Sequence, residues 1–401
     1  MKVIIFIGHH KVGTTSLQAF LAANAWKLRQ HGILYPSLRG YGLLEAPRLA
    51  VRYLTQAVLG STQLSTMNIN TREPHNALAF KMLEEAQGNK VPFHKDVPPS
   101  DDIFSDISYQ ARDAQAETII LCGEVFSNFS LAKVNLINQL RDQFKRYEVQ
   151  IMCTLRRVDQ YLISWQGQRI KFGHRVEPLH RGALEMYQHG IHFNYKTLLK
   201  GWRDSFPEAK FVVRNYSDTL RSGGSVEDFL KFADLDFPGE MLRLPNKNPS
   251  LPLAFYELCR QINLKYPPEK ARKYTQQIGA LSRSENLHLA KDIEMLGEKT
   301  RMEMFEAFRP ISRYLDQITD TPAFFSDLEN MLEIKPESEF SAACSAKQLL
   351  IDSPDTEKSI KDLIEPLPLD ACREHSQSCL LYTSPSPRDP RGDLVCRLLL
   401  E

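Results

Sequence analysis

The sequence predicts an α/β protein built on a parallel β-sheet with helices on both faces. The chain opens with a strand, a glycine-bounded turn and a helix, and short apolar runs then alternate with helical segments. This alternation is typical of a parallel sheet that helices cover on both sides. With 401 residues and 42% apolar content, the chain has the composition of a globular protein with one large domain or two ordinary ones.

The elements follow in order along the first 335 residues. Apolar runs predict strands at 2–7, 33–35, 117–122, 148–155 and 210–214. Helical spacing predicts helices at 16–30, 44–59, 75–86, 131–145, 157–172, 195–205 and 225–233. The stretch at about 60–112 is expected as an insertion, and 250–334 is expected to be helical throughout. Residues 1–335 are therefore expected to form one α/β domain with helical insertions and a helical C-terminal part.

The last part of the chain differs in composition. Beyond about residue 335, Ser, Glu, Asp, Lys and Pro dominate, which predicts a low-complexity, disordered tail at 336–401. The string from Cys379 to Asp389 also resembles translated read-through of a sequencing adapter. We interpret about 379–401 as a sequencing artefact and give it no functional weight.

Charge and cysteine content restrict the possible partners. The chain has 50 basic and 49 acidic residues, so no overall field attracts nucleic acid or an anionic membrane. The seven cysteines show no C-x-x-C spacing, as expected of reduced thiols. No apolar stretch is long enough for a signal peptide or a membrane span. We therefore expect a cytoplasmic protein without a transmembrane segment or a nucleic-acid partner.

The turn after the first strand has the features of a phosphate-binding loop. It reads Gly8-His-His-Lys-Val-Gly-Thr-Thr-Ser16 and leads directly into a helix. Such a turn points backbone N–H groups and the positive helix end at one place, which suits a phosphate group. The sheet is therefore expected to be of the P-loop type. The predicted binding residues are Lys11, Val12, Gly13, Thr14, Thr15 and Ser16.

The position of the lysine separates two kinds of phosphate ligand. The motif G-x4-G-K-[ST] places lysine after the second glycine, where this chain has Thr14, and its lysine lies inside the turn at Lys11. In a kinase or NTPase, the lysine after the glycine reaches the β- and γ-phosphates. A lysine inside the turn would instead stabilise charge on a bridging oxygen as its bond breaks. A P-loop kinase or NTPase and a solvated turn without a ligand are the alternatives.

The loop resembles the phosphosulfate-binding loop of PAPS-dependent sulfotransferases. That loop has the form P-K-[ST]-G-T-[ST], and here it is written His10-Lys-Val-Gly-Thr-Thr15. Further similarity to the bacterial branch of the family extends to about residue 335, while His10 replaces the usual proline. The resemblance implies transfer of the sulfuryl group from PAPS (3′-phosphoadenosine 5′-phosphosulfate) to a hydroxyl or amine. The expected acceptor is a small molecule or glycan, such as a carbohydrate or glycolipid, with PAP as product and no metal.

The resemblance also assigns a site for the 3′-phosphate of PAPS. The family holds this group with an arginine at a strand end and a serine eight residues later, and Arg156 and Ser164 reproduce that spacing. A guanidinium fork suits phosphate oxygens, and a hydroxyl adds a further donor. Surface arginines paired with Asp159 are the alternative. The R-K-G segment of many family members is not evident, unless Arg221-Ser-Gly-Gly224 takes its place.

Transfer to a hydroxyl also needs a base for the acceptor proton. Glu124 follows the predicted strand 117–122, so it is expected at the carboxyl edge of the sheet, where the loop also opens. The bacterial proteins often have Ser-x-Glu here, and this chain has Cys122-Gly-Glu124. His10 and His75 are alternative bases, and Glu124 as a structural acid is a further one. A protein that kept the fold but lost its base would bind PAP without turnover.

Overall fold

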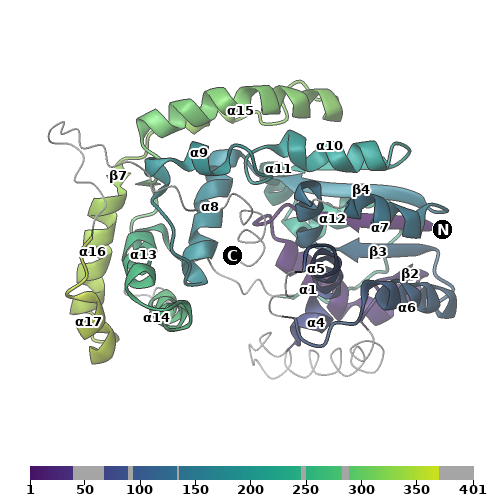
Figure 1. Ribbon diagram of the computed structural model, residues 1–401, viewed down its shortest axis with the longest axis horizontal. Helices are drawn as coiled ribbons and strands as arrows, with labels where there is room; N and C mark the ends of the chain where they lie inside the picture. Colours follow the sequence, from purple (N-terminus) through teal and green to yellow (C-terminus); the bar gives the residue numbers. More distant parts are fainter. Residues whose placement is uncertain (39–66, 89–93, 133–134, 245–249, 282–288, 370–401) are drawn as a thin grey trace. The chain divides into compact units, whose positions relative to one another are not determined.

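The computed structural model describes residues 1–38, 67–88, 94–132, 135–244, 250–281 and 289–369 (Figure 1). The chain divides into two compact units. The first unit comprises Met1–Arg157, Asn194–Asn248 and Ile311–Phe325, and the second comprises Val158–Phe193, Pro249–Pro310 and Ser326–Glu401. Both units draw on the stretch 1–335 that the sequence predicts as one domain. In the described part of the chain, no helix is both long and apolar enough to cross a membrane.

The first unit contains a five-stranded parallel sheet in the order β2-β3-β1-β4-β5. The strands are β1 (Lys2–Phe6), β2 (Ile33–Leu34), β3 (Thr118–Cys122), β4 (Glu148–Leu155) and β5 (Lys210–Asn215). The central strand is β1, in which Lys2 lies opposite Thr118 of β3 and Glu148 of β4. All five predicted strands are confirmed.

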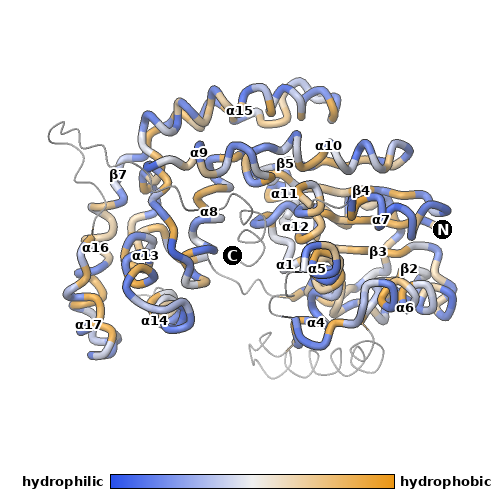
Figure 2. The backbone as a smooth tube through the Cα atoms, viewed as in Figure 1, coloured by the Kyte–Doolittle hydropathy of each residue, from blue (hydrophilic) through white to orange (hydrophobic). Residues whose placement is uncertain are grey.

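One face of the sheet is covered by α1 (Thr14–Ala23) and α12 (Ser225–Phe232). Phe20 of α1 and Phe229 of α12 pack with Ile4 and Phe6 of β1 in one buried cluster. Figure 2 shows the central strands as largely hydrophobic, which is typical of strands buried on both faces. The continuous apolar runs of the sequence therefore report this double burial.

The helices that follow β3 and β4 cover the other face. They are η2 (Glu124–Leu131), α7 (Leu136–Phe144) and α10 (Tyr195–Ser205), and α5 (Pro74–Gln87) packs on β3 and η2. The connection from β1 crosses the sheet toward β2, whereas those from β3 and β4 cross in the opposite direction. Right-handed crossovers in opposite directions place their helices on opposite faces. The predicted parallel sheet flanked by helices is confirmed.

The first predicted helix, 16–30, is divided in the structure into α1 and α2 (Ala25–Gln30). The break falls at Asn24, whose side chain bonds the chain near Leu242. The Asn24 amide donates to the carbonyl of Leu242 at 3.0 Å and accepts from its N–H at 2.8 Å. The helix ends here because this amide anchors a segment that is distant in sequence.

The described part of the predicted insertion is helical. It contains α4 (Ile69–Arg72), the whole of α5, and α6 (Ser100–Asp113). The predicted helix at 44–59 lies outside the described residues. After β5, the short helix α11 (Tyr216–Arg221) leads to α12. The insertion therefore adds helices beside β3, on the side of the sheet that carries β2.

The second unit is mainly helical. Its described helices are α8 (Val158–Lys171), α9 (Ala183–Tyr187), α13 (Tyr256–Lys265), α14 (Pro268–Leu281), the first part of α15 (Glu298–Thr319), α16 (Glu339–Asp352) and α17 (Lys358–Ile364). Short 3-10 segments are η3 (Leu179–Arg181), η4 (Leu253–Phe255) and η5 (Leu328–Leu332). Two short parallel strands, β6 (Ile293–Glu294) and β7 (Glu337–Ser338), pair with each other. The stretch 250–334 is therefore helical in large part but not throughout.

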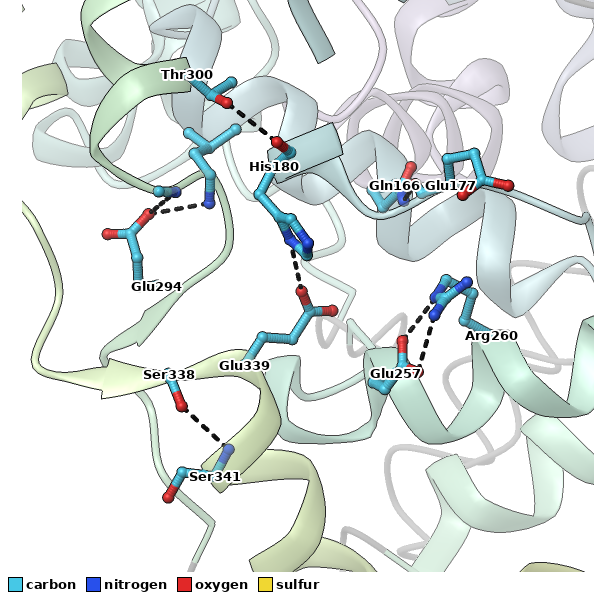
Figure 3. Close-up of polar contacts among 12 residues, drawn as sticks. Gln166, Glu177, His180, Glu257, Arg260, Glu294, Thr300, Ser338, Glu339 and Ser341 are labelled. Carbon is cyan, nitrogen blue, oxygen red and sulfur yellow. Dashed lines mark hydrogen bonds and ion pairs between the residues drawn. The ribbon is translucent and has the colours of Figure 1, made fainter. Parts of the chain in front are cut away.

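Buried polar pairs lie within and between the elements of this second unit (Figure 3). Arg260 donates to both carboxylate oxygens of Glu257, at 2.6 and 2.8 Å, and both side chains are almost fully buried. His180 Nδ1 lies 3.7 Å from Glu339 Oε2. Burial raises the pKa of Glu339, and the hydrogen bond with His180 only partly offsets this effect. The His180–Glu339 pair connects η3 to the start of α16, whereas the Glu257–Arg260 pair lies within α13.

The structure differs from the sequence expectation at the start of the tail. Residues that the composition assigns to disorder form α16 (Glu339–Asp352) and α17 (Lys358–Ile364). Ala342, Ala346 and Leu350 recur at helical spacing and are buried, and α16 packs on α13 and η4. Polar residues lie between these positions along the chain, so the overall composition concealed this helix face. The interpretation of 379–401 lies outside the described residues.

Candidate functional site

The loop of residues 8–13, called the glycine loop below, connects β1 to α1 at the carboxyl edge of the sheet. It first continues the pairing of β1 with β4, because the N–H of His9 donates to the carbonyl of Thr154 at 2.9 Å and the N–H of Thr154 donates to Gly8 at 2.7 Å. The backbone then turns at Lys11, with φ 62°, and at Gly13, with φ 85°. The predicted strand, turn and helix are all present.

Gly13 occupies a position that no other residue fits without strain. It lies immediately before α1 in a left-handed conformation that favours glycine. A Cβ atom built on Gly13 would lie 2.8 Å from Ser225 Oγ, and this hydroxyl donates to the Gly13 carbonyl at 2.9 Å. The start of α12 therefore packs against the glycine loop, a contact that sequence reasoning missed.

The other predicted loop residues have different environments. Val12 is fully buried and belongs to the core below the loop. Thr14 is buried, and its hydroxyl donates to the carbonyl of His9 at 3.2 Å. Thr15 and Ser16 lie in the first turn of α1 and are partly exposed. The structure therefore brings these residues together at one helix N-terminus, with Val12 pointing away from solvent.

Glu124 lies beside the glycine loop, immediately after β3. Its Oε1 is 3.4 Å from Nδ1 of His10, and a Cβ atom on Gly8 would lie 3.1 Å from its Cα. Burial raises the pKa of Glu124, but His10, the charge of Lys11 and a hydrogen bond from Thr14 outweigh burial and lower the pKa below its ordinary value. The structure therefore brings the three predicted catalytic residues, Lys11, Glu124 and His10, into one cluster with an ionised carboxylate.

His75, the other predicted candidate for the base, is buried and binds the backbone of β3. It lies in the first turn of α5 and is 2% exposed. Its Nδ1 accepts a hydrogen bond from the N–H of Cys122 at 3.1 Å, and burial lowers its pKa from 6.5 to about 3. Because this nitrogen lone pair is engaged, His75 holds the end of β3 and is not available as a base through Nδ1.

Arg156 follows β4, the strand next to β1. Its guanidinium lies over the ring of Tyr216, 5.3 Å from the centroid, and its carbonyl accepts from the hydroxyl of Tyr195 at 2.6 Å. Arg156 thus stands at the same edge of the sheet as the glycine loop. Ser164 lies on α8 in the second unit and is partly buried. The pairing of Arg156 with Ser164 stays a prediction.

Two other arginines of the first unit are engaged in ion pairs. Arg214 of β5 forms a bidentate pair with Asp228 of α12, at 2.9 to 3.3 Å. Arg221, in the segment considered as a substitute for R-K-G, pairs with Asp218 within α11 and is exposed. Among the described residues, no group of three or more His, Cys, Asp or Glu side chains is placed to hold a metal ion.

Comparison with known proteins gives limited similarity. No family model matches the chain, and no solved structure matches it. Over 194 residues the chain is 30% identical to a protein of Archaeoglobus fulgidus that is described as uncharacterized. This match covers 48% of the chain and 50% of the archaeal protein, so the chain spans about half the length of that relative.

Proposed function

We propose that this chain is a PAPS-dependent sulfotransferase on a P-loop-type sheet. The observation that carries the proposal is the cluster of Glu124 with His10, Lys11 and Thr14 at the carboxyl edge of the sheet. Sulfuryl transfer needs a base for the acceptor proton and a cation near the leaving phosphate. An ionised carboxylate beside a lysine in a glycine-bounded loop supplies both groups.

The surroundings of the loop fit an anionic nucleotide. The loop precedes the N-terminus of α1, which favours negative charge, and β1 and β4 form the point in the sheet where the crossovers diverge. Ligands of open α/β sheets bind at such a point. Arg156 follows β4 at this edge, and we assign it, with Ser164 by its spacing, to the 3′-phosphate. The buried thiols of Cys122, Cys153 and Cys259 are free, which suits a cytoplasmic protein.

Each residue of the cluster has a proposed role. When bound, PAPS supplies a sulfuryl group attached to phosphate through an S–O bond. Glu124 accepts the proton of the acceptor hydroxyl or amine while the oxygen or nitrogen of that group forms a bond to sulfur. Lys11 neutralises the charge left on the phosphate oxygen as its bond to sulfur breaks, and PAP is the product. His10 keeps the Glu124 carboxylate ionised and oriented. We propose a carbohydrate or glycolipid as the acceptor.

Calorimetric titration with PAP, ATP, and ATP with Mg²⁺ tests the choice of nucleotide. We expect PAP to bind at least about tenfold more tightly than ATP–Mg²⁺, which corresponds to about 1.4 kcal/mol. The reason is that Thr14 stands where a kinase or NTPase has its phosphate-binding lysine. Tighter binding of ATP–Mg²⁺ would overturn the proposal in favour of a P-loop kinase or NTPase.

A variant of Arg156 tests whether the 3′-phosphate is bound apart from the glycine loop. Arg156→Met is expected to weaken PAP binding and to leave the binding of AMP, which lacks the 3′-phosphate, unchanged. Equal losses for both nucleotides would contradict the role of Arg156. PAP binding without turnover across a panel of hydroxyl and amine acceptors would instead identify an inactive PAP-binding protein.

A further inference from the structure

The backbone around Glu124 is held by side chains from two different helices. We call residues 122–127 the Glu124 turn. At its first residue, Cys122, the carbonyl accepts from Gln18 Nε2 of α1 at 3.0 Å, and the N–H donates to His75 Nδ1 of α5 at 3.1 Å. Within the turn, the hydroxyl of Ser127 donates to the carbonyl of Glu124 at 2.6 Å. The turn is thus fixed by buried polar contacts and not only by its own strand.

Asn76 of α5 contacts the residue that follows Glu124. Its Oδ1 accepts from the N–H of Val125 at 3.3 Å, and its Nδ2 donates to Glu73 Oε2 at 3.1 Å. Arg72 in turn binds the other oxygen of Glu73, at 2.6 and 2.8 Å. Asn76 is 3% exposed. It therefore connects the Glu124 turn to a partly buried ion pair at the corner between α4 and α5.

The turn has little room on either side. A Cβ atom on Gly123 would lie 3.1 Å from Asn76 Oδ1, and one on Gly8 would lie 3.1 Å from Glu124 Cα. The turn is therefore in close contact with α5 on one side and with the glycine loop on the other. Any movement of the turn away from α5 would change the separation of Glu124 from His10.

We propose that Asn76 is a positioning residue, which ties the Glu124 turn to the Arg72–Glu73 pair and so sets the place of the Glu124 carboxylate against the glycine loop. The part that concerns catalysis rests on the proposed sulfotransferase function. The claim that Asn76 sets the position of Glu124 concerns the ligand-free protein. Glu124 is influenced by titratable or hydrogen-bonding groups from every element around it, namely His10, Lys11, Thr14, Glu73 and Cys122.

The substitution Asn76→Ala tests the proposal. Loss of the bond to Val125 would loosen the turn and weaken the contacts of Glu124 with His10 and Lys11, while the burial that opposes ionisation remains. We expect the pKa of Glu124, followed by carboxyl ¹³C NMR in the ligand-free protein, to rise by about one unit. We also expect kcat to fall roughly tenfold with the dissociation constant of PAP unchanged, because Asn76 acts on the base and not on the nucleotide.

Two further variants separate positioning from stability. Asn76→Asp keeps an oxygen for the N–H of Val125 but cannot donate to Glu73, so the Val125 amide should keep the protection from hydrogen exchange that Asn76→Ala loses. Asn24→Ala removes an equally buried asparagine that makes comparable bonds to Leu242. It is expected to lower stability without moving the pKa of Glu124.

The outcomes distinguish this inference from the proposed function. An unchanged Glu124 pKa in folded Asn76→Ala protein would overturn the positioning role, whether or not the chain binds PAP. The same would follow if Asn24→Ala shifted this pKa as much as Asn76→Ala. A raised pKa in a protein that fails to bind PAP would support the positioning role and reject the sulfotransferase.

Discussion

At the scale of single residues, the ionisation state of Glu124 results from opposing effects. Burial favours the neutral carboxyl, whereas the nearby cationic and hydrogen-bonding groups of the glycine loop favour the carboxylate. The loop groups prevail, so the carboxylate persists to a pH below the ordinary pKa of 4.5. A base with this pKa is fully available at neutral pH. In the proposed reaction the limited strength of this base leaves more of the rate enhancement to Lys11 and the leaving phosphate.

Glu124→Gln removes the proposed base and keeps its shape. We expect turnover of PAPS to fall about 100-fold or more, because general bases contribute on that order, while PAP binding is retained. In the wild-type protein, activity should be lost on acidification only as the pH falls through the lowered pKa of Glu124, that is, below 4.5.

The matched control is Glu117→Gln, an exposed glutamate just before the other end of β3. It should leave activity and the acid limb of the pH profile unchanged. Normal turnover of Glu124→Gln would eliminate Glu124 as the base and turn attention to His10.

The sequence predicts the residues of this cluster but not the residues that hold them in place. Lys11 and His10 are predicted from the turn after the first strand, and Glu124 is predicted because a parallel sheet brings the carboxyl ends of its strands to one edge. Gln18, Asn76 and Ser225 were missed as contributors, since each acts through a hydrogen bond to backbone that is distant in sequence. A glutamine or asparagine in a helix carries no signal for such a bond. The Gly223-Gly224 pair before Ser225 is the one local sign of a special backbone there.

At the scale of elements, α5 and β3 are joined by a histidine that stays neutral. The pKa of His75 is lowered from 6.5 to about 3, so the unfolded chain binds a proton at a higher pH than the folded chain does. Stability is therefore lost as the pH falls from 6.5 toward 3, by up to on the order of 4 kcal/mol for this one group. The end of β3, and with it the Glu124 turn, is thus sensitive to acid through a residue outside the cluster of Glu124, His10 and Lys11.

His75→Asn tests this element contact. Asparagine can still accept from the N–H of Cys122 but does not titrate, so the pH dependence of the free energy of unfolding should flatten between 6.5 and 3. Urea denaturation over this pH range measures the effect. Some slope should remain, because burial also lowers the pKa of His94, to about 4. A slope identical to that of the wild type would show that His75 is protonated without cost in the folded protein.

At the scale of the whole molecule, the tail that composition assigned to disorder contributes structure to the second unit. The fully buried Ala346 and Leu350 of α16 pack within that unit, and Glu339 at its start contacts His180. Sequence patterning located all five strands because doubly buried strands read as apolar runs. It could not locate the division into two units, since both units interleave along the chain.

Truncation after residue 335 compared with truncation after residue 369 tests this assignment. The shorter chain loses α16 and α17. We expect the free energy of unfolding of its second unit to fall by several kcal/mol, because each large buried side chain that is removed contributes about 2 kcal/mol. Hydrogen exchange at the amides of α13 measures the loss, and amides of β1 serve as the internal control. Equal protection of α13 in both chains would restore the predicted boundary at 335.

The central place of β1 also bears on how the protein is made. Among the five strands of the sheet, β1 comes first along the chain, and it pairs with Thr118–Cys122 on one side and with Glu148–Met152 on the other. More than 100 residues must therefore be added after β1 before its neighbour β3 is complete, and β4 follows later still. Such long-range pairings form slowly. Until then, the apolar strand β1 and the glycine loop lack the neighbouring strands β3 and β4. Binding of a nucleotide, which we propose for the glycine loop, would therefore become possible only after β3 and β4 have been synthesised, and chaperones that shield extended apolar segments would act on β1 before then.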